Sequence, residues 1–108
     1  MFTASYQETM DEAGSAARAR EREAFGMAIA ALEAVRGVPP VDPARRDAVR
    51  RVQELWRILI ADLASEANAL PDHLRADLVS IGLWAIREAD RLLSGETEDV
   101  GPLVEVLA

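Results

Sequence analysis

Chemistry in this chain would have to come from very few side chains. The 108 residues include one His and no Cys, which excludes disulfides, thiolate metal sites and cysteine nucleophiles. His73, with Asp72 and Asp77 close by in sequence, is the one group that suggests a metal or acid–base site. Acids are favoured near the start of a helix in any case, and one His with two carboxylates is too little for a zinc site or a catalytic triad. We therefore interpret this cluster as structural and expect neither enzymatic activity nor a cofactor.

The charge distribution argues against nucleic acid and membranes as partners. Nineteen acids oppose twelve Arg, with no Lys, for a net charge of −7. A phosphate backbone is gripped by a basic stripe with interleaved aromatics, but here the Arg residues between positions 45 and 54 alternate with Asp47 and Glu54, as on a solvated helix face. No apolar run reaches the ~18 residues of a membrane span, and the N-terminus lacks the pattern of a secretory signal. We expect a cytoplasmic protein.

The elements that position these residues are helices. Apolar side chains recur with helical spacing over residues 16–36, 43–65 and 71–94, and no segment before the tail alternates like a strand. Ser5 and Glu8 form a capping box that starts a helical arm over residues 5–13, and Gly14-Ser15 breaks it. A short helical element follows at 102–107. The sequence therefore predicts one all-α domain, residues 1–108, in which three long helices form an up-down-up bundle.

Helix ends and faces follow from individual residues. We expect Gly37 to end the first long helix in a left-handed conformation, and Asp42 to cap the second. The first helix has an alanine-rich core face flanked by Phe25, Met27 and Ala31. The second carries an apolar stripe, and Arg45 belongs to its predicted solvated side. That stripe consists of Ala48, Val52, Leu55, Leu59 and Leu63, widened by Trp56 and Ile60.

The third helix carries more apolar surface than one core contact needs. Leu78, Ile81, Ala85 and Leu92 form one stripe, while a second stripe lies beside it. Gly82, in mid-helix, suggests that another backbone passes close by. Trp is enriched among residues that dominate binding, although a core position is the stronger alternative for Trp56. The candidate partner-binding residues are Val79, Leu83, Trp84 and Ile86 on this helix, Trp56 on the second helix, and Tyr6 and Met10 on the arm.

Blocks of this sequence are similar to a known family. Leu70-Pro71 followed by residues 74–89 (LRADLVSIGLWAIREA) resembles the central signature of FlaF, a family of small flagellar biosynthesis regulatory proteins of alphaproteobacteria. Residues 20–24 (REREA), 55–56 with 60–64 (LW, IADLA) and 101–106 (GPLVEV) resemble further FlaF blocks in the same order. The resemblance extends over nearly the whole chain.

The resemblance implies a non-enzymatic role in flagellum assembly. FlaF-like proteins support flagellin production and export as cytoplasmic chaperones, with the amphipathic terminal helices of flagellin as the implied partner. A regulator that acts with FlbT on flagellin messenger RNA is the alternative, and a homodimeric helical adaptor is a third. The apolar surplus on the third helix suits a client helix or a second copy equally well, so monomer and homodimer both stay open.

Overall fold

The chain folds into helices where the periodicity predicts them. The computed structural model describes residues 16–107, which form α2 (Ala16–Ala34), α3 (Pro43–Ala64), α4 (Asp72–Ser94) and α5 (Gly101–Leu107). All regular secondary structure in this range is helical, which confirms the all-α class. The observed boundaries lie within two residues of the predicted ones. The arm at 5–13, its capping box, the break at Gly14-Ser15, and the candidate residues Tyr6 and Met10 lie outside the described residues.

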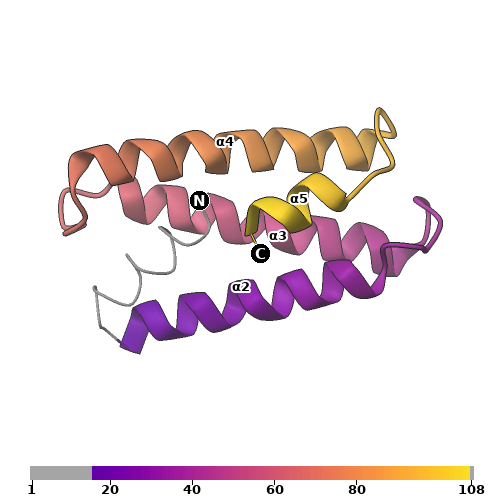
Figure 1. Cartoon of the computed structure of the whole chain (residues 1–108), viewed down its shortest axis with the longest axis horizontal. Helices are drawn as coiled ribbons and strands as arrows, with labels where there is room; N and C mark the ends of the chain where they lie inside the picture. Colours follow the sequence, from indigo (N-terminus) through magenta and orange to yellow (C-terminus); the bar gives the residue numbers. More distant parts are fainter. Residues whose placement is uncertain (1–15, 108) are drawn as a thin grey trace.

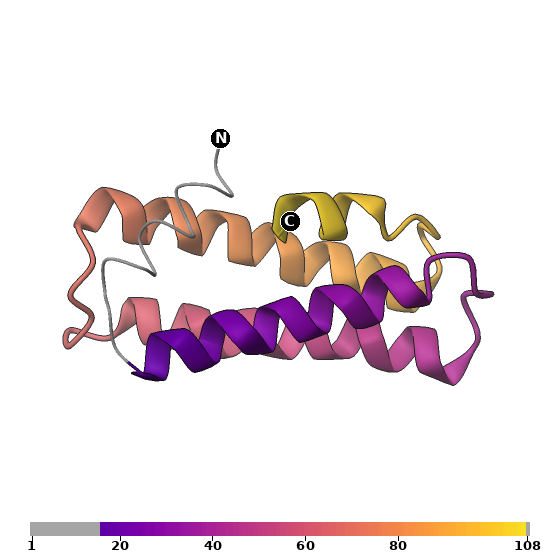
Figure 2. The same cartoon turned by 60° about the horizontal axis from the view of Figure 1, so that its bottom comes forward.

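Helix α3 is the centre of the arrangement. It packs along α4 on one side and along α2 on the other, while α5 packs against α2 and α4. Figures 1 and 2 show α2, α3 and α4 side by side, with consecutive helices running in opposite directions. The molecule measures 40 × 23 × 22 Å, so its long axis is the direction of the helices.

The core contains large side chains from every described helix. Trp56 is 1% exposed, and its ring meets Phe25 of α2 edge-to-face at a centroid distance of 5.4 Å. On α5, Leu103 is fully buried and Val104 nearly so, as is Val100 just before the helix. The short C-terminal element is therefore part of the core rather than a loose tail.

Two helix ends are capped through their own residues. Asp42 accepts a hydrogen bond from the Ala44 amide at 2.9 Å, as predicted, and Pro43 begins the helix. Gly95 ends α4 in the left-handed region with φ 82°. It is the only described residue with positive φ, so the predicted left-handed cap at Gly37 is wrong. Helix α2 already ends at Ala34, and Gly37 lies in the turns that follow.

The Arg45 side chain binds backbone carbonyls of two loops. Arg45 is 5% exposed, so the prediction of a solvated Arg45 is wrong. Its guanidinium donates to the carbonyls of Arg36 and Val38 after α2 and of Glu98 before α5. A planar group with five donors can bind carbonyls of two loops at once, which explains why a buried charge is tolerated here.

Two further arginines connect helix ends to neighbouring helices. Arg46 donates to the Leu93 carbonyl near the end of α4 at 3.0 Å. Arg75 donates to the Leu63 and Ser65 carbonyls at the end of α3, at 3.4 and 3.5 Å. These bonds satisfy carbonyls that a helix leaves unpaired at its C-terminus and fix the relative positions of the helices.

A candidate partner-binding groove

His73 is exposed on the first turn of α4, and no three metal-ligating side chains of the described part lie together. Within residues 16–107, no helix is both long and apolar enough to cross a membrane. Several large apolar side chains are exposed on the surface, namely Met27, Val41, Ile58 and Leu83.

The candidate residues of α4 do not form one surface. Leu83 is 45% exposed, whereas Val79, Trp84 and Ile86 are half-buried and pack against the core. Leu83 and Trp84 are consecutive, so they point about 100° apart around the helix. Val79, Leu83 and Ile86 share one flank of α4, and Trp84 lies toward the other.

A side-chain hydrogen bond and a glycine hold α4 close to α3. The Nε2 of Gln53 donates to the Ile86 carbonyl at 3.0 Å and to the Asp90 carboxylate at 2.8 Å. A Cβ on Gly82 would lie 2.7 Å from Ile60 Cδ1 and 2.8 Å from Trp56 Cε3. The glycine thus allows α3 to come close, and the atoms nearest to it belong to side chains of α3. Trp56 itself is in the core, as its alternative interpretation had it.

Two acids surround Arg91 near the end of α4. The buried Glu88 makes an ion pair with Arg91 at 2.7 Å. Arg91 also pairs with Glu96 of the following loop at 3.1 Å. Both acids raise the pKa of Arg91, with the hydrogen bond to Glu96 as the larger cause. The pair with Glu96 ties the loop after α4 to the helix.

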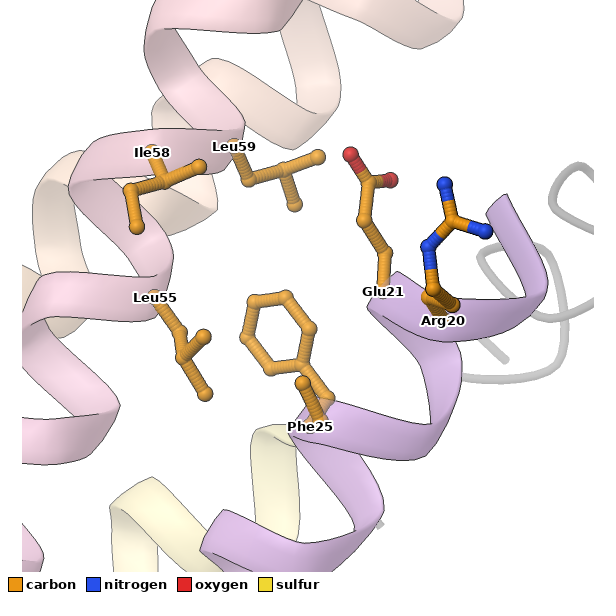
Figure 3. Close-up of a pocket in the computed structure, with 7 residues that line it drawn as sticks. Arg20, Glu21, Phe25, Leu55, Ile58 and Leu59 are labelled. Carbon is orange, nitrogen blue, oxygen red and sulfur yellow. The ribbon is translucent and has the colours of Figure 1, made fainter. Parts of the chain in front are cut away.

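An apolar cavity lies between the first half of α2 and the second half of α3. It has a volume of about 320 Å³. Figure 3 shows the Phe25 ring of α2 pointing toward α3, with Leu55, Ile58 and Leu59 on the other side of the cavity. Arg20 and Glu21 lie at its edge. Ile58 is 53% exposed, so this large aliphatic side chain has only part of its surface covered within the chain.

A second hollow continues between the same two helices. It has a volume of about 710 Å³, and small side chains make most of its apolar lining. These are Ala31 and Ala34 of α2, Val35 just after it, and Ala44 and Ala48 of α3, bordered by Asp47, Arg50, Arg51 and Glu54. Both hollows lie along the same pair of helices. We call them together the α2/α3 groove, whose lining falls between residues 20 and 35 and between residues 44 and 59.

The groove was not predicted from the sequence. Of the residues expected to flank the core face of the first long helix, Phe25 is buried, whereas Met27 is 63% exposed and Ala31 is also exposed. The signal was present in α3, where Ile58, Leu59 and Ile60 are consecutive and cannot all face one neighbour. The outward residue, Ile58, is the one at the groove.

Comparison with known proteins gives the chain its family. The family model described as flagellar protein FlaF matches residues 2–108. The chain belongs to the FlaF family. Neither the curated proteins nor the solved structures contain a match.

Membership of the FlaF family agrees with the sequence blocks that resemble FlaF, and the structure shows where the central block lies relative to the groove. The FlaF signature over residues 74–89 includes Gly82, Ala85 and Ala89, which are all buried in α4. In this FlaF family member the signature thus forms the tight contact with α3, while the α2/α3 groove is built from other residues. A signature that packs the core says little about where a partner binds.

Proposed function

We propose that this FlaF family member binds flagellin subunits as a cytoplasmic export chaperone, with an amphipathic terminal helix of flagellin in the α2/α3 groove. The observation that carries the proposal is an open apolar groove whose lining includes a half-exposed Ile58 beside the Phe25 ring. Membership of a flagellar protein family supports flagellin as the class of client. The terminal helices of flagellin stay unpaired until the subunit polymerises, and a groove of this kind would cover their apolar face.

The dimensions of the groove suit a single helix. It follows α2 from Arg20 to Ala34, and fifteen helical residues span about 22 Å at 1.5 Å per residue. A client helix of about four turns would lie along α2 and α3 and complete a four-helix cross-section with α4. Large apolar side chains in such a groove are the usual anchors of helix recognition.

The flank of α4 is the competing surface for the same client. Leu83 is the large side chain exposed there, while Val79 and Ile86 beside it are half-buried. The groove offers a concave shape and two hollows, and it therefore buries more of a helix than a single protruding Leu on a convex flank. We assign the client helix to the groove for this reason.

The matched pair Ile58→Ser and Leu83→Ser separates the two surfaces. Both residues are aliphatic, about half exposed and on helices, so both variants should fold. Titration calorimetry with flagellin of the same organism should give about tenfold weaker binding for Ile58→Ser, because about 1.4 kcal/mol of apolar contact is lost. Leu83→Ser should bind like the unchanged protein. The reverse result would place the client on α4.

The alternative role, regulation of flagellin synthesis through its messenger RNA, can be tested in parallel. The exposed arginines of α3 are interleaved with acids, as in the pairs Arg50–Asp47 at 3.4 Å and Arg57–Glu54 at 3.9 Å. Such pairing weakens attraction for a phosphate backbone. A pull-down with flagellin and FlbT side by side should retain flagellin directly. No flagellin binding, or tight and salt-sensitive RNA binding, would refute the chaperone proposal.

A further inference from the structure

Helices α2 and α4 flank α3 without packing along each other. The main contacts of both helices are with α3 and with α5. A seam therefore lies between Ala16–Ala34 and Asp72–Ser94, with α3 beneath it, and we call it the α2/α4 seam. In Figure 1, α5 lies between α2 and α4 and runs from the end of α4 toward the middle of the molecule.

Helix α5 is too short to cover the whole seam. A Cβ on Gly101 would lie 2.8 Å from Nη2 of Arg36, so α5 begins beside the residues that follow α2. Its seven residues span about 10 Å, so it reaches about the level of Ile29. The part of the seam between Ile29 and Ala16 is about 20 Å long at 1.5 Å per residue, and α5 leaves it open.

One face of α3 runs along the floor of the seam from end to end. Arg45, Val52, Trp56 and Leu63 recur at spacings of seven and four, so they share this face. Arg45 donates to the Glu98 carbonyl just before α5, which places its end of the face beneath the start of α5. The other end continues to Trp56 and Leu63, in the part that α5 does not reach.

The side chains in this open part are nevertheless buried. Trp56 and Leu63 are each 1% exposed, Leu78 of α4 is 2% exposed, and Phe25 of α2 is 3% exposed. Large apolar side chains buried to this degree need neighbours on every side. Because α2 and α4 do not pack together and α5 ends too early, a further segment is needed as a cover.

The length and attachment of residues 1–15 suit this role. They join α2 at Ala16, which is the end of the seam that α5 leaves open. The predicted break at Gly14-Ser15 would let the chain turn back along α2. A helix over residues 5–13 would span about 14 Å, which is most of the open length.

The sequence of the same segment supplies one apolar face. Tyr6, Met10 and Ala13 recur at spacings of four and three, so a helix would place them on one side. Glu8 and Asp11 would lie on the other side, toward solvent. A helix with a single apolar face is what a seam with solvent above it requires.

We propose that residues 1–15 turn back along α2 and lie as a further helix in the open part of the α2/α4 seam. Met10 then packs near Leu63, and Tyr6 packs near Trp56. These two side chains of the arm complete the core, and the α2/α3 groove on the other side of α2 stays free. The inference concerns the seam alone and does not depend on the proposed function.

Unfolding of the full chain tests whether the arm belongs to the core. Met10 lies on the predicted apolar face of the arm, and its neighbour Asp11 does not. Met10→Ser should lower the Tm by about 4 °C or more, because a buried apolar contact is lost, whereas Asp11→Ser should change it by less than about 1 °C. Equal Tm values for the two variants would overturn the inference.

Double-mutant cycles test which surface the arm covers. Ile81 belongs to the same stripe of α4 as Leu78 and is half-buried, whereas Ile58 lies in the α2/α3 groove. The losses of stability in Met10→Ser and Ile81→Ser should be less than additive, because the two side chains share one contact. The losses in Met10→Ser and Ile58→Ser should add. Coupling of Met10 to Ile58 instead would place the arm in the groove and overturn the inference.

Methyl spectra of the unchanged protein give the contact directly. The Met10 methyl group should show nuclear Overhauser effects to the methyl groups of Leu63 and Leu78. A sample that mixes labelled and unlabelled chains shows whether these effects arise within one chain. Their absence would overturn the inference, and so would effects between chains, because the arm of a second copy would then fill the seam.

Flagellin binding distinguishes a core role of the arm from a client-binding role. Calorimetry at a temperature where Met10→Ser is folded should give binding within twofold of the unchanged protein. If Met10→Ser keeps its Tm but loses flagellin, the arm holds the client, and the inference fails while the chaperone proposal stands. If the unchanged protein does not bind flagellin, the proposed function fails, and the Tm and methyl contacts still decide the inference.

Discussion

Replacing Gly82 by Ala should destabilise the protein, although alanine is the better helix former. Both Gly82 and Gly26 lie inside long helices. Taken alone, Gly→Ala in a helix stabilises by about 1 kcal/mol. A Cβ at position 82 would lie 2.7 and 2.9 Å from the end of Ile60 and 2.8 Å from the Trp56 ring. A Cβ at position 26 would have nothing within 4 Å.

The expected change in the free energy of unfolding follows from the surroundings of Gly82 and Gly26. Ile60 is half-buried and can rotate, but Trp56 is fully buried and packed against Phe25, so α4 must shift away from α3. Overpacking of this kind costs about 1–3 kcal/mol. Gly82→Ala should therefore lower the free energy of unfolding by between zero and about 2 kcal/mol. Gly26→Ala should raise it by about 1 kcal/mol. The two variants should differ in Tm by at least about 4 °C.

Urea unfolding followed by circular dichroism measures both free energies of unfolding. A further variant, Ile60→Ala in the Gly82→Ala background, should recover part of the loss if the Ile60 side chain is the obstacle, and a double-mutant cycle gives the coupling. Equal stabilisation by Gly82→Ala and Gly26→Ala would refute the reasoning, because it would mean that α4 does not rest on α3 at Gly82.

Three further changes test the contacts that hold the helices in place. Arg45→Lys should lower the free energy of unfolding by about 2–3 kcal/mol, since an ammonium cannot bond both loops as the guanidinium does, whereas Arg57→Lys at an exposed ion pair should change it by less than about 0.5 kcal/mol. Asp42→Ala removes the cap of α3 and should cost about 1 kcal/mol, and Asp42→Asn should retain most of it. Leu103→Ala in α5 should cost about 2–5 kcal/mol, because the side chain is fully buried. Chemical unfolding measures all of these, and a negligible effect of Leu103→Ala would show that α5 is dispensable for the core.

Periodicity and capping residues were enough to predict the helices. The 3–4 spacing of apolar residues in α3 and the Asp42-Pro43 start are local signals, and both the helix and its cap are confirmed. The role of α5 was harder to predict, because seven residues carry little periodicity. Its burial depends on where the chain returns after α4, which is a tertiary property.

The candidate site was less predictable for a similar reason. The apolar surplus on α4 is visible in the sequence. The sequence does not show, however, that Gly82 and the alanines let α3 come close enough to cover most of this surplus. The position of Arg45 on the helix predicts a solvated side chain, but two loops fold over it. The groove at Ile58 depends on the relative placement of two helices, which no single helix pattern specifies.

Small residues have opposite consequences on the two sides of α3. In α4, Gly82, Ala85 and Ala89 face inward and are buried, so the two backbones approach closely and the contact is closed. In α2, Ala31 and Ala34 face outward and leave the surface low beside α3. A helix can therefore be added at α2 without opening the core, because Phe25, Trp56 and their neighbours are already packed beneath the groove. Closed packing on one side and an open groove on the other would let the proposed client helix bind while the fold of this chain remains intact.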